Sequence, residues 1–325
     1  MMNKKMTPHV IVLGALVAFI TVFGSACAMF SRGTTVVDLF WDTALLQNVT
    51  RLTDDGITKS WARVSPDGER LLYMEEDRGR QNIFLLRDVN VPAKTPLIND
   101  ALALGWHDNS ENFFFIDRDH RLVRSGTAGG GRTFVTRNPV GARDSNPTIR
   151  RGAILLDTEM GGRRQIVSMR ENGTEITFLG DGMNPSWHPT EPRFVFIRGR
   201  SVFEMDLASL QATQLFDPGA GSWAGNPQFA GNGEFIIFQV SAVQEITGTA
   251  VQRAGGRAVR AMRVTGEQRN RHLFMMRANG TEISTLTVPE VDTFSLSWDE
   301  VNGFAYFISN ATGRTEIFRA RINFD

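Results

Sequence analysis

A phrase of about ten residues recurs along the chain and restricts the possible folds more than any other feature. Each copy opens with an aromatic or β-branched residue, passes through a polar turn and ends in an apolar run, as in Val64–Tyr73 and Phe229–Phe238. The copies open at Val64, Trp106, Ile149, Trp187, Phe229 and Trp298. Steps of 42, 43, 38 and 42 residues match the length of a four-stranded propeller blade, and the final step of 69 leaves room for an insertion.

Each repeat predicts four antiparallel strands. The opening residue belongs to the first strand and the apolar run forms the second. Third strands are expected at Ile83–Leu86, Ile166–Met169, Val202–Met205, Leu273–Met276 and Ile317–Ala320. Asn172-Gly173 and Asn279-Gly280 predict tight turns into fourth strands, because a type I′ turn needs positive φ at both central residues.

The two ends of the repeat region are complementary. The sixth copy supplies three strands, whereas Val49–Thr53 resembles a spare fourth strand. Pairing Val49–Thr53 beside Ile317–Ile322 would close the ring and remove two exposed sheet edges. We therefore expect an all-β, six-bladed propeller over residues 49–325, closed by its N-terminal strand.

Several motifs resemble the TolB-type six-bladed propeller family. They are the phrase Ser65–Tyr73, the Asn-Pro-Ser-Trp segment at Asn184–Trp187 and the Asn-Gly-Thr-Glu-Ile turns that begin at Asn172 and Asn279. The resemblance covers about residues 49–322 and implies a periplasmic, WD40-like repeat protein that binds other proteins. The family carries an α/β domain ahead of its propeller, and the short segment 27–48 has no counterpart of it, so the resemblance predicts the fold and leaves the partner open.

The N-terminus has the features of an export signal. Lys4 and Lys5 precede the apolar stretch Val10–Phe23, and small residues follow up to Cys27. A single membrane helix is the alternative, although the stretch is short for a span. We assign residues 1–26 to a signal peptide and residues 27–48 to a tether.

Cys27 is the only cysteine and lies at the end of that signal. Gly-Ser-Ala-Cys resembles a bacterial lipobox, which predicts lipidation of Cys27 and a membrane-anchored lipoprotein in the periplasm. Ala26-Cys27-Ala28 also fits an ordinary cleavage site, which would remove the thiol.

The insertion within blade five, at about residues 240–270, is rich in arginine. Charge over the whole chain is balanced, with 35 basic and 35 acidic residues, so no overall basic field favours nucleic acid. The insertion holds Arg253, Arg257, Arg260 and Arg263, which we select as candidate partner-binding residues. It is either a solvated hairpin without a task or an arm that contacts a partner, since long loops in compact domains are often functional. As a connection between the second and third strands, it is expected to share one face with the loops that lead into first strands.

No motif for catalysis, a metal or a cofactor stands out. His107 and His188 occupy equivalent turn positions, no His or Cys spacing fits zinc, and no Gly-x-Ser-x-Gly elbow is present. Lysine is absent after residue 94. The sequence therefore predicts a non-catalytic scaffold that binds a protein or peptide at the cell envelope. A lyase-type propeller enzyme acting on a polysaccharide and a small-ligand sensor are the alternatives.

Overall fold

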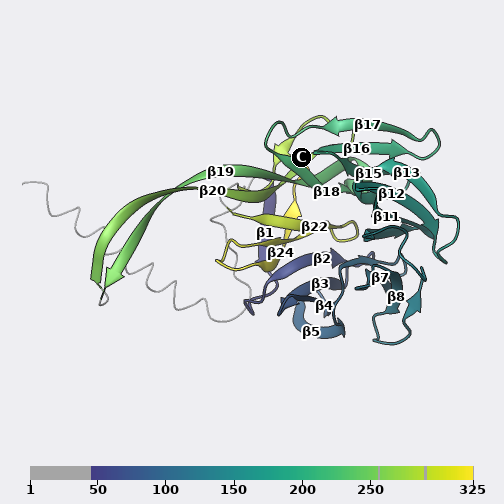
Figure 1. The fold of residues 1–325 in the computed structure, drawn as a ribbon, viewed down its shortest axis with the longest axis horizontal. Helices are drawn as coiled ribbons and strands as arrows, with labels where there is room; N and C mark the ends of the chain where they lie inside the picture. The colour runs from purple at the N-terminus through teal and green to yellow at the C-terminus, as the bar shows by residue number, and fades with distance from the viewer. Residues whose placement is uncertain (1–44, 255–256, 289–290, 325) are drawn as a thin grey trace, which may run out of the picture. The chain divides into compact units, whose positions relative to one another are not determined.

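The computed structural model describes residues 45–324 except 255–256 and 289–290, and for residues 92 and 244–268 it describes the backbone alone. These residues form six four-stranded antiparallel sheets, the blades of a β-propeller (Figure 1). Blade one contains β2 (Lys59–Val64), β3 (Leu71–Asp77), β4 (Arg80–Asp88) and β5 (Val91–Ile98). Blade two contains β6 (Ala103–Trp106), β7 (Asn112–Ile116), β8 (Leu122–Gly126) and β9 (Thr133–Phe134). Blade three contains β10 (Ser145–Arg150), β11 (Ala153–Met160), β12 (Arg163–Arg170) and β13 (Thr177–Asp181).

The remaining blades follow the same order, apart from the closure of the last one. Blade four contains β14 (Met183–Trp187), β15 (Arg193–Arg198), β16 (Ser201–Asp206) and β17 (Gln211–Phe216). Blade five contains β18 (Trp223–Ala230), β19 (Phe235–Ala254), β20 (Arg257–Arg277) and β21 (Ser284–Thr285), with a short 3₁₀ turn at Gly231–Gly233. Blade six joins β22 (Thr293–Asp299), β23 (Phe304–Ser309) and β24 (Glu316–Ile322) to β1 (Leu46–Arg51), the first strand of the described chain.

The repeated polar turn joins the first strand of a blade to the second, as the sequence predicts. In blade one the backbone N–H of Gly68 donates to the carbonyl of Ser65 at 2.9 Å, and the Ser65 hydroxyl accepts the N–H of Arg70 at 2.9 Å. Gly68 has φ +74°, a conformation that costs glycine little. The apolar run beyond this turn therefore returns antiparallel beside the first strand.

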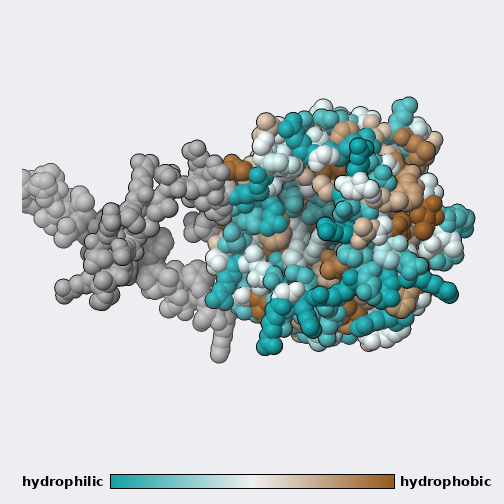
Figure 2. Space-filling view, viewed as in Figure 1, coloured by the Kyte–Doolittle hydropathy of each residue, from teal (hydrophilic) through white to brown (hydrophobic). Residues whose placement is uncertain are grey.

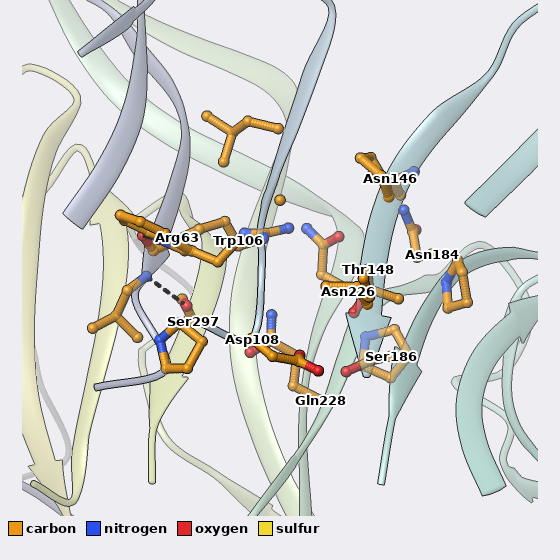
Figure 3. A pocket seen from close by; sticks show the side chains of 18 residues that line it. Arg63, Trp106, Asp108, Asn146, Thr148, Asn184, Ser186, Asn226, Gln228 and Ser297 are labelled. Atoms are coloured by element: carbon orange, nitrogen blue, oxygen red, sulfur yellow. Dashed lines mark hydrogen bonds between the residues drawn. The ribbon is translucent and has the colours of Figure 1, made fainter. Parts of the chain in front are cut away.

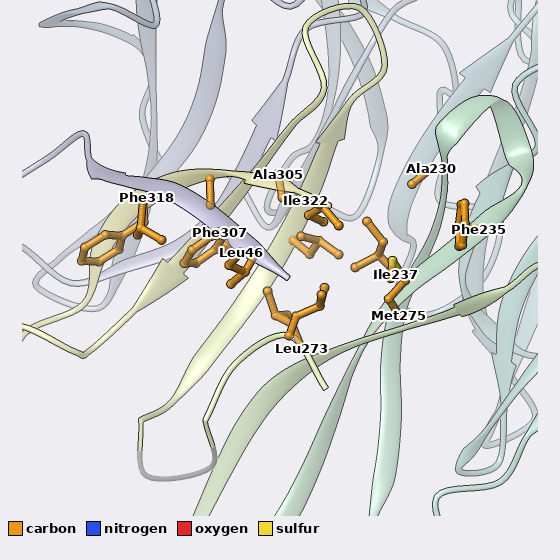
Figure 4. Close-up of a cluster of buried hydrophobic side chains, with 14 residues drawn as sticks. Leu46, Ala230, Phe235, Ile237, Leu273, Met275, Ala305, Phe307, Phe318 and Ile322 are labelled. Atoms are coloured by element: carbon orange, nitrogen blue, oxygen red, sulfur yellow. The ribbon is translucent and has the colours of Figure 1, made fainter. Parts of the chain in front are cut away.

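Ring closure by the N-terminal strand is confirmed. Strand β1 pairs antiparallel with β24, with Leu46 opposite Ile322 and Arg51 opposite Phe318. Leu46, Phe307 and Phe318 are all at most 1% exposed and belong to one apolar cluster between blades five and six (Figure 4). Because β1 supplies both the missing hydrogen bonds of β24 and part of this core, the first and last segments of the propeller stabilise each other.

The hydrophobic core is distributed between neighbouring blades. Leu72, Leu85, Leu104 and Phe113 pack between blades one and two, and equivalent clusters occupy the other junctions. The second and third strands are apolar on both faces, as in LLYM of β3 and FVFI of β15, because each blade is covered by two neighbours. On the face shown in Figure 2, hydrophobic side chains lie in small groups among polar ones. No helix within the described residues has the length and hydropathy needed to cross a membrane.

The insertion in blade five is a long two-stranded hairpin. Strand β18 pairs with β19 as far as Ser241, whereas β19 and β20 continue to pair with each other from Ala242 opposite Asn270 to Ala254 opposite Arg257. We call residues 242–270 the arm; Figure 1 shows these strands running on beyond the rest of their blade. The arm connects a second to a third strand, as predicted. It therefore lies on the face that carries those connections and the loops leading into first strands, here called the arm face.

Candidate functional site

The first strands of the blades line a central channel, and three of them carry an Asn-Pro bulge. Asn146, Asn184 and Asn226 have φ of 49°, 52° and 45°, and each precedes a proline. The register with the second strand shifts at each of these positions. Proline fits there because the first strand is the inner edge of its blade, where no ladder hydrogen bond is lost. Asn184 and Asn226 belong to β14 and β18, because the bulge lets each strand continue through its Asn-Pro pair.

Two cavities lie along this channel. The upper cavity, about 460 Å³, opens at the arm face and is lined by the starts of first strands, including Ser60, Trp61 and Phe294, and by Arg271 at the base of the arm. The lower cavity, about 200 Å³, lies toward the opposite face and is lined by later residues of the same strands, including Arg63. Asn184 and Asn226 line both cavities, so they mark the junction between them.

Side chains from neighbouring blades satisfy the inner edges of the first strands. Ser295 Oγ accepts the N–H of Ala62 at 2.9 Å, and Ser297 Oγ accepts the N–H of Val64 at 3.0 Å (Figure 3). Gln228 Nε2 donates to the carbonyl of Leu296 at 2.8 Å. These contacts join the blades around the channel and hold the cavity walls in place. They satisfy backbone groups at the inner edges of the first strands without pairing those strands with a further strand.

Arg63 is the positively charged side chain among the residues that line the lower cavity. Its Nη1 donates to the carbonyls of Ala62 at 2.8 Å and Leu296 at 3.3 Å, and to Ser295 Oγ at 3.3 Å. The guanidinium lies 4.9 Å from the ring centre of Trp61. Burial lowers the pKa of Arg63 to about 10, and no neighbouring charge contributes to that shift. Arg63 is thus a rigidly held cation whose hydrogen-bond partners among the described residues are all neutral.

At the base of the arm, aromatic and arginine side chains lie together on the arm face. Trp223 is 45% exposed, and the Arg269 guanidinium stacks over it at 4.3 Å. Val243, opposite Arg269 in the hairpin, is 43% exposed. Toward the channel, Arg271 forms an ion pair with Asp292 at 2.6 Å and covers Phe294 at 3.5 Å. The mouth of the upper cavity and the base of the arm therefore form one surface of aromatic and cationic groups.

A buried charge cluster links blade six to blade one beside this mouth. Lys59, whose residue is 1% exposed, lies 2.5 Å from Asp55 and 3.2 Å from Glu316. Burial raises the pKa of Asp55, but hydrogen bonds from Lys59 and Lys94 outweigh that effect and hold it well below its ordinary value. Because each charge in this cluster has a partner, we assign it a structural role.

His107 and His188 act as turn residues, as their repeat positions suggested. Their Nδ1 atoms accept the backbone N–H groups of Asn109 at 3.1 Å and Thr190 at 3.2 Å. Burial, together with the charge of Arg193, lowers the pKa of His188. Among the described residues, no group of three or more His, Cys, Asp or Glu side chains is arranged to hold a metal ion.

The predicted partner-binding arginines all lie in the outer half of the arm. By backbone pairing, Arg253 lies opposite Ala258, Arg257 opposite Ala254, Arg260 opposite Gln252 and Arg263 opposite Thr249. Their role stays a prediction. Cys27, the predicted lipidation site, lies outside the described residues.

Sequence reasoning missed Arg63, Trp61 and the channel junction. The repeated Asn-Pro pair at Asn146, Asn184 and Asn226 was the available signal, since three prolines at one repeat position indicate an edge strand. Nothing comparable marks Arg63, because its neutral surroundings come from residues about 230 positions away.

Comparison with known proteins identifies the fold through structure alone. No protein-family model matches the chain, and no curated protein matches it significantly. Among solved structures, a putative TolB from Agrobacterium tumefaciens superposes with a TM-score of 0.57 at 13% identity, covering 83% of this chain and 92% of that one.

Two further structures show the range of proteins that share this architecture. TolB from Acinetobacter baumannii gives a TM-score of 0.55 at 13% identity, covering 79% of this chain and 64% of that one. An oligogalacturonate lyase in complex with manganese gives a TM-score of 0.54 at 13% identity, covering 90% of this chain and 97% of that one. Identities this low establish the architecture and leave the activity open. The chain therefore has a six-bladed β-propeller fold like that of the TolB structures.

Proposed function

We propose that this protein is a non-catalytic scaffold of the bacterial cell envelope that binds a protein or peptide through its arm face. The observation that carries the proposal is the surface at the base of the arm, where Trp223, Val243 and Arg269 are exposed beside the mouth of the upper cavity. Exposed aromatic and arginine side chains that lie together are typical of binding hot spots.

The arm extends this surface and gives it a positive character. Arg253, Arg257, Arg260 and Arg263 follow one another along its outer half. An acidic protein or peptide is the partner that complements such a row, and its association should weaken as salt screens the charges. The long paired strands suit this role, because their backbone pairing within the hairpin forms an extended two-stranded element.

The envelope location rests on the N-terminal segment and on the resemblance to TolB. A signal peptide over residues 1–26 would export the chain, and Cys27 would carry a lipid that anchors it in the periplasm. Mass spectrometry of the mature N-terminus tests this part. A lipid-modified Cys27 supports the anchor, whereas an N-terminus at Met29 or an intact Met1 contradicts it.

Charge neutralisation tests the binding surface. The variant Arg253→Gln, Arg257→Gln, Arg260→Gln, Arg263→Gln should fold normally and lose most of the partner that co-purifies with the wild-type protein from the envelope fraction. The matched control neutralises four exposed arginines on the opposite face, Arg87, Arg151, Arg170 and Arg321. Equal loss in both variants, or full retention in the arm variant, would refute the assignment of binding to the arm.

The similarity to an oligogalacturonate lyase favours one second candidate, an enzyme that cleaves an acidic polysaccharide. Incubation with oligogalacturonate and Mn²⁺, followed by ultraviolet absorbance of an unsaturated product, distinguishes the two. We expect no product. Turnover at a rate proportional to protein concentration would contradict the scaffold proposal and support the enzyme.

A further inference from the structure

We infer that the lower cavity of the channel is a binding site for a small carboxylate, with Arg63 as its charged contact. The inference concerns a different surface from the arm and does not depend on an arm-face partner. It rests on the position of Arg63, on its fixed orientation and on the polar walls around it.

Arg63 is partly buried, and a cation that is partly withdrawn from water among neutral groups is costly, because these groups replace its hydration poorly. Nη1 of Arg63 is bound by two carbonyls and a hydroxyl, and these are the guanidinium contacts within hydrogen-bonding distance among the described residues. The remaining donors of the planar guanidinium are left for a ligand in the cavity that Arg63 lines. A carboxylate matches that donor geometry, since two parallel N–H groups can bind its two oxygens.

The carboxylate that the protein itself contributes to this cavity, Asp108, is used elsewhere. It accepts the backbone N–H of Arg151 at 2.6 Å, and its charged neighbours are His107, Arg150 and Glu171. It does not contribute to the pKa of Arg63. Asp108 is therefore not paired with the guanidinium, and the remaining donors of Arg63 can bind an external anion.

The rest of the wall is built for a polar ligand of small size. Figure 3 shows Arg63 and Trp106 on one side of the cavity and Asn146 and Asn184 on the other, with Asn226 between them. Amide and hydroxyl groups of this kind can donate to or accept from a second polar end. A volume of about 200 Å³ is comparable to roughly six or seven water molecules, which limits the ligand to a carboxylate of about two to four carbons.

Orientation of Arg63 is fixed before any ligand arrives. Trp61 stacks on the guanidinium, and the indole N–H of Trp106 donates to the Arg63 carbonyl at 2.7 Å. A ligand would therefore not have to order this side chain, which lowers the entropic cost of binding.

Thermal unfolding at constant ionic strength, with succinate exchanged for chloride, tests the inference. The Tm of the wild-type protein should rise with succinate and follow a saturable dependence, while Arg63→Gln should show no rise. The matched control Arg200→Gln, an exposed arginine paired with Asp217, should respond like the wild type. A rise of equal size in Arg63→Gln would overturn the site.

The carboxylate could come from a free small molecule or from the side chain of a partner peptide. A second experiment distinguishes these two sources. Ac-Gly-Asp-Gly-NH2 is titrated beside Ac-Gly-Asn-Gly-NH2 and succinate by calorimetry. Binding of succinate assigns a free ligand, and binding of the aspartyl peptide alone assigns a partner side chain. If neither the peptide nor succinate gives a heat of binding, the inference is wrong.

A measurement on the unmutated protein keeps the test decisive if Arg63→Gln does not fold. The indole N–H signal of Trp106, which lines the lower cavity, is assigned in NMR spectra with Trp106→Phe and should shift saturably with the bound probe. Trp223 is the internal control, because it lies under another arginine, Arg269, and outside the cavity. A shift of Trp223 without one of Trp106, or equal shifts of both, would show that the cavity is not the site.

Discussion

Glu316 is the side chain whose loss should weaken ring closure most clearly. It is 2% exposed, lies in β24 and accepts hydrogen bonds from Thr53 Oγ1 at 2.5 Å and from the backbone N–H of Gly56 at 2.9 Å. It also lies 3.2 Å from the buried ammonium of Lys59. Glu316 thus joins the last strand of the propeller to the segment between its first two strands.

The change Glu316→Gln preserves the shape of the side chain and removes its charge. Removing one partner of a buried ion pair costs about 3–5 kcal/mol, because the other charge stays buried. One amide oxygen of glutamine can still accept from Gly56, and Asp55 still contacts Lys59, so we expect a loss of about 3 kcal/mol in the free energy of unfolding. For a propeller of about 280 residues with an unfolding entropy of about 2.1 cal/mol/K per residue, this corresponds to a fall in Tm of about 5 °C.

Urea and thermal unfolding of the purified propeller measure the effect. Glu76→Gln is the control, because Glu76 is an exposed carboxylate on β3 and its neutralisation should cost less than about 0.5 kcal/mol. If Glu316→Gln loses no more stability than Glu76→Gln, the buried pair does not hold the closure and the reasoning fails.

Three further outcomes follow from the same structure. Removal of residues 1–51 should expose the edge of β24 and produce oligomers or aggregates, detectable by light scattering after size exclusion, and a stable monomer would contradict the role of β1. Trp187 is only partly buried, whereas Phe194 is 0% exposed. In chemical unfolding, Trp187→Ala should therefore lower the free energy of unfolding by about 2 kcal/mol and Phe194→Ala by about 3–5 kcal/mol. The reverse order would contradict the packing. Because His188 has a lowered pKa in the folded state, the unfolded chain binds a proton more readily, and stability should fall as pH drops through the ordinary range near 6.5. His188→Asn should reduce this loss of stability at low pH. An unchanged pH dependence would mean that another group causes the loss.

Most of the fold could be predicted from the sequence because the repeat is local. Val64 to Tyr73 contains its own turn, and the ladder of β2 and β3 follows from that turn and the apolar pattern. Closure was also predictable, because Val49–Thr53 resembles a fourth strand and the sixth repeat lacks one. The repeat pattern does not distinguish the burial of its opening tryptophans: Trp106 is 8% exposed, but Trp187 and Trp298 lie at the edge of their clusters.

The channel was harder to predict because it is made by contacts between distant blades. Ser295 and Ser297 look like ordinary strand residues, yet they bind the inner edge of β2 from the other end of the chain. Likewise, Arg269 in β20 gains its neighbour Trp223 in β18 only when both strands are paired with β19. Periodicity identifies strands, but it does not specify which polar side chains meet across a ring.

Site-specific photo-crosslinking in producing cells tests the binding surface most directly. A photoreactive residue is placed at Val243, which is 43% exposed on the arm face, and in a parallel strain at Val301, which is 65% exposed in a turn on the opposite face. We expect a discrete, salt-sensitive protein adduct from position 243 and none from position 301. An adduct from position 301 alone, or the same adducts from both positions, would contradict the claim that the arm face is where this propeller binds its partner.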